Sequence, residues 1–481
     1  MVSMAGAVSD KVSFPSIPGL AIKPRMGCHF ATGTLCRMTT RNPPTAATRA
    51  IVAHTALSRS AQRWIFLYLG TLVFLLAFGS PASGLIDIPF SFFLKNKLHL
   101  PAQELADFRL VAAIPVYLSF VFGFIRDVWN PFGMKDRGFM LLFGGITAAL
   151  YVLFVAFTPV STGTLLVAII VLMTSYLFVA SAQNGLASSI GQQHAISGQI
   201  SAVWNIFSSI PNIAAFLLGG SLSSLLERKN AEQTVHIIFL IGAAIMALVA
   251  AYAALRPRSV FDNLRNERTA TVEPLKDIRR LIRHWPIYPA LLIWTLWNFS
   301  PGAETPLQYY LQNTLNGGDA NWGQFNAIAE ASYILTFIVF GLLCRKYPLK
   351  NLLLWGTVIA VPQMVPLLLV HSATDALIAA MVMGLMGGIA TAAYIDLIIR
   401  SCPAGLQGTI LMTSAALSAI VSRFGDVLGT FLYEEYGGFG TCVVMITVVY
   451  ALILPALLLI PKDLIVTADG QKLQIVDQAK G

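Results

Sequence analysis

Apolar stretches fill most of this chain and leave few folds open to it. Between residues 64 and 460, twelve mostly apolar stretches alternate with short polar connections. A helix needs roughly 20 apolar residues to cross the ~30 Å hydrocarbon core of a bilayer. Over the whole chain 56% of residues are hydrophobic and 11% are charged, whereas a soluble domain is about 25% charged. The chain is therefore expected to be an all-α membrane protein with twelve transmembrane helices.

The twelve stretches form two sets of six, separated by a hydrophilic segment. The first set is expected at 64–93, 103–126, 138–158, 163–187, 197–226 and 234–255, and the second at 287–314, 322–344, 349–371, 374–399, 406–434 and 438–460. The predicted regions are a basic, disordered tail (1–63), an N-terminal six-helix bundle (64–255), a central loop (256–286), a C-terminal six-helix bundle (287–461) and a C-terminal tail (462–481).

Two of the stretches repeat each other at an offset of 210 residues. Gly198–Leu222 and Gly408–Leu432 share seven identical positions without a gap, among them Gly198/Gly408. A hydrophobic chain built from two similar halves is typical of secondary transporters, whose substrate site lies between the halves. The repeat predicts two pseudo-symmetric bundles. It also shows where they differ, because Arg423 and Asp426 replace Ile213 and Phe216.

Basic residues indicate the orientation. They concentrate in the central loop and in the loops after the second and eighth stretches, which predicts that both termini are cytoplasmic. We expect a monomer in the inner (plasma) membrane of a bacterium, with an organelle membrane as the alternative. Residues 1–63 hold eight basic residues and one acid. We interpret this segment in one of two ways. It is a tail, part of which comes from a start codon assigned upstream of Met38, or it is a transit peptide.

Several function classes are disfavoured. The net charge of +9 follows from loop residues that set topology, and no nucleic-acid-binding module is visible, so nucleic acid is not an expected partner. The five cysteines form no CxxC motif and the seven histidines are scattered. We therefore expect no metal site, no cofactor and no enzymatic activity. A sensor or assembly factor that does not transport remains the alternative function.

The loop after the second stretch contains a candidate gate. Gly123 and Asp127 close one helix, and a short turn leads to Lys135 and Arg137 at the start of the next. An acid and bases in this arrangement can pair in one state and separate in another. Positive-inside anchoring would explain the bases, but it does not require the acid or the glycines. The equivalent loop after the eighth stretch keeps basic residues and lacks the acid.

This loop resembles the signature of the major facilitator superfamily. Two passages are similar to the folate–biopterin transporter family and to the related muropeptide permease group: Pro115–Arg137, and the turn Cys402–Thr409 that leads into the eleventh stretch. The resemblance implies the major facilitator fold and transport of a small solute. The sequence departs from related carriers in the fourth stretch, where Gln183 and Asn184 stand in place of an acidic pair.

Charged residues inside the stretches are the candidate site. Each costs at least about 2.5 kcal/mol in the bilayer and usually faces a cavity. Arg423 and Asp426 lie three residues apart and could pair; they are interpreted either as an anion or proton site or as a structural ion pair. Glu304 follows Pro301–Gly302 and is expected beside a helix break, and Glu330 is a candidate proton carrier.

Polar and aromatic side chains could complete the cavity. Gln183, Asn184, Trp204 and Asn298 can hydrogen-bond or stack on a flat solute, although Trp204 also fits a packing role. We expect a secondary active transporter that moves a small organic, anionic solute by alternating access, with the proton as coupling ion.

Overall fold

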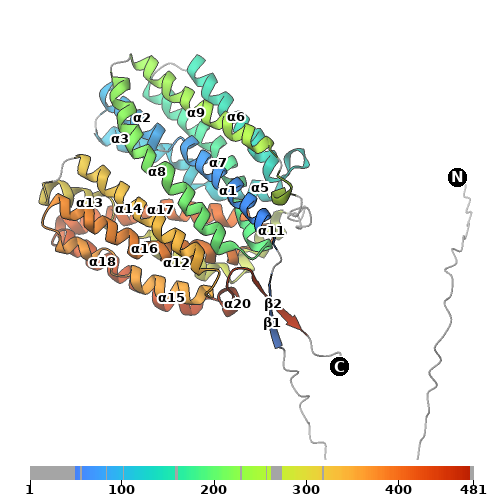
Figure 1. The fold of residues 1–481 in the computed structure, drawn as a ribbon. Helices are drawn as coiled ribbons and strands as arrows, with labels where there is room; N and C mark the ends of the chain where they lie inside the picture. The colour runs from blue at the N-terminus through green and yellow to red at the C-terminus, as the bar shows by residue number, and fades with distance from the viewer. Residues whose placement is uncertain are drawn as a thin grey trace, which may run out of the picture. The chain divides into compact units, whose positions relative to one another are not determined.

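The computed structural model describes residues 49–54, 57–82, 84–100, 102–157, 161–227, 230–255, 257–261, 274–316 and 319–476. The predicted N-terminal tail lies outside the described residues up to residue 48, so neither interpretation of it is tested. Within the described part, two sets of six membrane spans are present. In Figure 1 the blue-to-green helices of the first set lie together, and so do the yellow-to-red helices of the second.

The first set is built from both long and broken helices. In chain order its six spans are α1 (Arg59–Gly79) with α2 (Gly84–Asn96); α3 (Ala102–Ala112), α4 (Ile114–Tyr117) and α5 (Ser119–Val128); α6 (Asp136–Phe157); α7 (Thr162–Gln193); α8 (Ser197–Glu227); and α9 (Ala231–Ala254). A short 3-10 turn, η1 (Pro131–Gly133), connects α5 to α6.

The second set repeats this plan. Its spans are α12 (Ile287–Asn298), α13 (Thr305–Tyr309) and η3 (Tyr310–Thr314); α14 (Asp319–Leu343); α15 (Leu349–Ala360) and η4 (Val365–Leu369); α16 (Ala373–Ser401); α17 (Gln407–Glu435); and α18 (Phe439–Ala451), α19 (Ile453–Ala456) and η5 (Leu457–Leu459). Between the sets lie α10 (Arg258–Phe261) and α11 (Pro274–Arg283), and α20 (Lys462–Ile465) follows the last span.

Helix starts and breaks follow local chemistry. Ser161 forms a capping box at the start of α7. At the start of α16 the Ser372 hydroxyl accepts a hydrogen bond from the Asp375 amide. Both caps satisfy backbone amides that a helix leaves unpaired at its N-terminus. The predicted break at Pro301–Gly302 separates α12 from α13, with Gly302 at φ +112°. Proline removes a backbone donor, and such interruptions are tolerated in membranes where protein covers them.

Nine helices in the described residues are long and apolar enough to cross a membrane on their own. Two of the other spans are divided into short helices, α3–α5 and α12–η3, and the third is α8, which contains Pro211. The prediction of twelve helical membrane spans is therefore confirmed. The exact bundle boundaries remain predictions.

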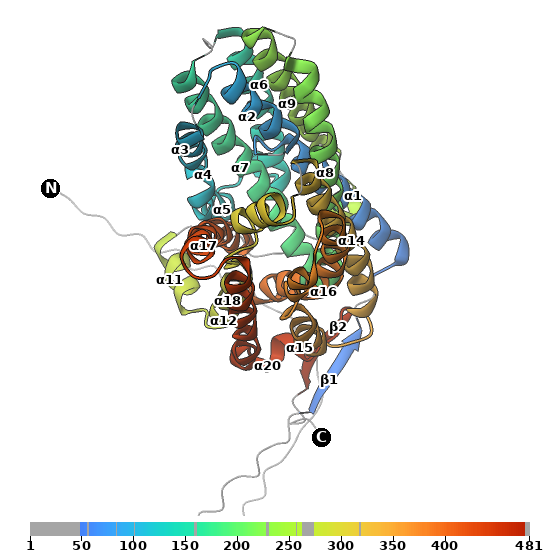
Figure 2. The ribbon, with the colours of Figure 1, turned by 90° about the vertical axis from the view of Figure 1, so that its left-hand side faces the viewer.

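The two repeat helices make most of the contacts between the sets. The first, α8, packs against α14 and α16, and the second, α17, packs against α5 and α7. These are equivalent spans, since α14 and α5 are the second spans of their sets and α16 and α7 the fourth. Figure 2 shows α17 beside α5. The contact between the sets is thus built twice with the same elements.

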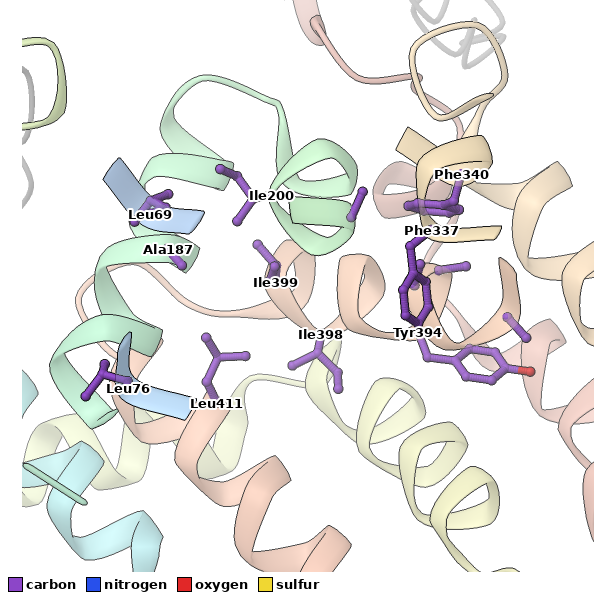
Figure 3. Close-up of a cluster of buried hydrophobic side chains, with 14 of the residues drawn as sticks. Leu69, Leu76, Ala187, Ile200, Phe337, Phe340, Tyr394, Ile398, Ile399 and Leu411 are labelled. Atoms are coloured by element: carbon purple, nitrogen blue, oxygen red, sulfur yellow. The ribbon is translucent and has the colours of Figure 1, made fainter. Parts of the chain in front are cut away.

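Buried apolar side chains hold the sets together near one end, which we call the terminal end because α1 starts and α20 lies there. Ala187 and Ile200 from the first set and Ile399 and Leu411 from the second belong to one buried cluster (Figure 3). The Gln192 side chain of α7 donates to the carbonyls of Ile399 and Cys402 in the other set at 2.7 and 2.6 Å.

A small sheet was not predicted. Strand β1 (Arg49–His54) pairs antiparallel with β2 (Gln471–Val476), with Arg49 opposite Val476. Both strands lie in segments that were predicted as tails. Their pairing joins residues more than 400 positions apart, and this is information that local sequence patterns do not carry.

Candidate functional site

A buried carboxylate ties α5 to α17. Asp127 Oδ1 accepts a hydrogen bond from the Gly408 amide at 3.1 Å, and Oδ2 accepts from the amide and hydroxyl of Thr409 at 2.7 and 2.6 Å. These amides are among those that a helix leaves unpaired at its N-terminus, where the helix dipole also favours an anion. Asp127 therefore links the second span of one set to the fifth span of the other.

Arg126 neutralises this site. Its Nη1 donates to Asp127 Oδ1 at 2.6 Å, and the same guanidinium bonds Asp136 at the start of α6. All three side chains are largely buried. The result is a compact acid–arginine–acid cluster, in which charge-assisted bonds replace the water that burial removes.

Glycine permits the close approach of these helices. A Cβ at Gly123 would lie 2.5 Å from the Gly408 carbonyl oxygen and 2.9 Å from Met412 Cβ. A Cβ at Gly408 would lie 2.8 Å from Asp127 Oδ1. All three distances are too short for a carbon atom, so this contact requires glycine at both positions.

The other two predicted gate residues lie apart from Asp127. The Lys135 amide donates to the Asn130 side chain at 2.6 Å, and its side chain interacts electrostatically with Asp136. Arg137 donates to the carbonyls of Ala253 and Ala254 at 3.0 and 2.6 Å, at the end of α9 in its own set. The structure thus brings Gly123 and Asp127 together, and it joins Arg137 to a different helix.

A second buried charge cluster lies at the same end of the molecule. Arg400 Nε donates to Asp396, four residues earlier on α16, at 2.9 Å, and Nη2 donates to Asp469 at 2.9 Å. Both carboxylates are buried. Burial, followed by the nearby Asp396 carboxylate, raises the pKa of Asp469 to about 6, and Arg400 opposes that rise.

The predicted amides lie at the contact between the sets. Gln183 and Asn184 are buried in α7, and the Asn184 amide points at Met412 Sδ at 3.3 Å. Gln183 Nε2 has no hydrogen-bond partner within the described part of the chain. A buried amide without a partner is costly, so Gln183 is a residue that a bound polar molecule could satisfy. Trp204 is half-buried and packs against the apolar core.

Two further predicted residues face neighbouring helices. Glu330 of α14 is half-buried and hydrogen-bonds the Ser209 hydroxyl of α8, across the two sets. Asn298 ends α12, and its side-chain oxygen accepts from Ser418 of α17 at 2.5 Å. Glu330 is therefore a side chain whose partner belongs to the opposite set.

The remaining candidates are Glu304, in the break of the seventh span, and Arg423 and Asp426 of α17. Asp426 accepts the Thr305 amide at 2.9 Å and the Thr305 hydroxyl at 2.8 Å, and so caps α13. Among the described residues no salt bridge joins it to Arg423, although both interact electrostatically with the exposed Glu304. Asp426 thus fastens the broken span to α17, and Arg423 is left exposed beside it.

Sequence reasoning did not single out the partners in these clusters. Arg126 is adjacent to Asp127 at the end of α5, and this adjacency was the one feature of the sequence that could have indicated it as a partner. The Thr305 partner of Asp426 follows the predicted break directly. Asp469 gave no signal, because it lies in a polar segment outside every apolar stretch.

Comparison with known proteins identifies the chain. A sequence model of the BT1 family matches residues 80–479. The chain belongs to the BT1 family. A relative named "Folate-biopterin transporter", from Synechocystis sp., is 25% identical over 373 residues, which are 73% of this chain and 72% of that protein. The resemblance predicted from Pro115–Arg137 and Cys402–Thr409 is therefore confirmed.

Solved structures confirm the fold of this BT1 family protein. The major facilitator superfamily transporter FucP, in the outward conformation, matches with a TM-score of 0.62 and 16% identity over 82% of this chain and 98% of that chain. The human organic anion transporter MFSD10 (TETRAN) matches with a TM-score of 0.58 and 14% identity over 83% and 100%. The protein is a multi-pass membrane transporter with the major facilitator fold, and not an enzyme.

Proposed function

We propose that this protein moves a small organic anion across the membrane by alternating access and that proton movement drives the transport. In this proposal the bundles 64–255 and 287–461 rock about a site between them, and the terminal end faces the cytoplasm. The support comes from the contacts between the sets, the placement of charged side chains, and the names of similar proteins: a folate-biopterin transporter, an organic anion transporter and a fucose:proton symporter.

One face of α17 carries the argument. Met412, Ala416, Ala419 and Arg423 follow one another along one side of the helix at spacings of three or four residues. Met412 and Ala416 are buried, Ala419 is half-buried and Arg423 is exposed. At Met412 this face packs against the first set. In this proposal the sets touch at Met412 and part beyond it, and the exposed guanidinium of Arg423 binds the anion there.

Solute counterflow tests the proposal directly. Purified protein in liposomes loaded with one unlabelled organic acid should accumulate the same labelled acid, and folates, pterins and other small carboxylates form the panel. Saturable counterflow above that of protein-free liposomes supports the proposal. If no member of the panel gives saturable counterflow or a saturable flux driven by a pH gradient, transport of an organic anion is rejected.

Glu330→Gln is expected to separate proton coupling from solute binding. Glutamine resembles the protonated acid and cannot release a proton, so uptake driven by a pH gradient should fall at least about tenfold while counterflow stays within about twofold. Both rates are measured in the same liposomes. Glu435→Gln, an exposed acid of α17, is the matched control. Gradient-driven uptake equal to that of the wild type would remove Glu330 from the coupling step.

A further inference from the structure

The two repeat helices start in the same way. In α8 and in α17 the second residue is glycine, Gly198 or Gly408. In each helix a buried carboxylate accepts from that glycine amide and from the next amide: Asp127 from Gly408 and Thr409, and Asp469 from Gly198 and Gln199 at 3.3 and 2.8 Å. An arginine bonds each carboxylate, Arg126 in one case and Arg400 in the other.

The two carboxylates come from different places in the chain. Asp127 ends the second span of the first set. The equivalent place in the second set is the end of α14, where the chain has the buried Cys344 followed by basic residues and no acid. Asp469 occupies this position from the segment after the last span. Its amide donates to the Cys344 carbonyl at 2.9 Å, and Cys344 Sγ lies 3.6 Å from its Oδ2.

The segment from 461 to 470 is bonded to both sets. Arg400 of α16 donates to the carbonyls of Leu464 and Thr467 at 3.2 and 2.9 Å, which joins the segment to the second set. The Gly470 amide donates to the Ala195 carbonyl in the turn between α7 and α8 at 2.6 Å. If the sets separate at this end, Asp469 must lose its bonds on one side. These are either its bonds to Arg400 and Cys344 in the second set or its hydrogen bonds from the amides at the start of α8.

We propose that Asp469 is the missing acid of a second gate, supplied by the C-terminal segment, and that it closes the start of α8 as Asp127 closes the start of α17. This rests on the proposed alternating access. Arg400 and the Cys344 carbonyl hold Asp469 on the second set, and Gly198 and Gln199 leave its carboxylate when the terminal end opens. A Cβ at Gly198 would lie 2.9 Å from Cys344 Cβ, so the same movement uncovers the thiol of Cys344.

Cys344 is a native reporter of this movement. It is 1% exposed, and its alkylation by a maleimide can be followed by peptide mass spectrometry on the full chain in detergent, without a solute. Asp469→Asn should raise the alkylation rate about tenfold, because the loss of a charged cap at a helix start weakens the closed state. In Asp469→Glu the alkylation rate of Cys344 should be close to that of the wild type, because the carboxylate is kept. Asp463→Asn, an exposed acid of the same segment, is the matched control and should change nothing.

Thermal unfolding of each variant distinguishes a gating role of Asp469 from a role in stability alone. All alkylation rates are measured at least about 15 °C below the unfolding midpoint, where global unfolding is negligible. Faster alkylation of Cys344 in Asp469→Asn, with no change in Asp463→Asn, supports the second gate. A wild-type rate in Asp469→Asn, with or without a lower midpoint, overturns it. Because no solute takes part, this outcome is independent of the counterflow result, which tests the proposed function alone.

Discussion

Gly123→Ala is expected to reduce transport to roughly a tenth of the wild-type rate or less while the protein still inserts and folds. The added methyl group would lie 2.5 Å from the Gly408 carbonyl oxygen, which belongs to backbone and cannot turn away. Overpacking of this kind costs about 1–3 kcal/mol. In this protein the cost falls on the state in which α5 and α17 are in contact, so the equilibrium moves toward the open terminal end.

Gly145→Ala is the matched control for this experiment. Gly145 is also a helical glycine of the first set, and a Cβ built there meets nothing within 4 Å, so transport should stay normal. Counterflow and the thermal unfolding midpoint are measured for both variants. Gly408→Ala provides a graded second test, because its Cβ would meet the Arg126 and Asp127 side chains, and its effect should be smaller than that of Gly123→Ala. Normal transport by Gly123→Ala would falsify the gate at this contact.

The sequence predicts the parts of this structure that are periodic or local. The apolar stretches mark the spans to within a few residues, and Pro301–Gly302 marks the break in the seventh span. Each of these depends on residues close together in the chain, where helical geometry fixes the distances.

The partners across helices depend on which helices meet. The repeat at Gly198 and Gly408 indicated symmetry, but it did not show that both glycines make room for a carboxylate. Asp426 lies one turn from Arg423, and it nevertheless bonds Thr305 of another span because that span is broken there. Asp469 lies 125 residues from Cys344, and the sheet joins two segments predicted as tails. Such contacts follow from tertiary packing, and a single sequence has no local signal for them.

Arg423→Ala is expected to abolish uptake of an anionic solute without affecting insertion. The side chain is exposed, and it lies on the face of α17 that meets the first set at Met412, nearer the terminal end. A hydrogen bond to a charged group contributes about 1.5–3 kcal/mol, so the apparent affinity should fall roughly 10- to 100-fold, and Arg423→Lys should retain part of it. Lys95→Ala, an exposed cation elsewhere, should have no effect.

A double variant separates anion binding from charge balance. Arg423 interacts electrostatically with Glu304, so its loss could harm transport only because Glu304 loses its counter-ion. If Arg423 binds the solute, adding Glu304→Gln to Arg423→Ala leaves uptake at the low level of the single variant. Recovery of uptake in the double variant would assign Arg423 to charge balance, and normal uptake by the single variant would exclude it from the site altogether. In both of those cases the anion would require a different cation between the sets.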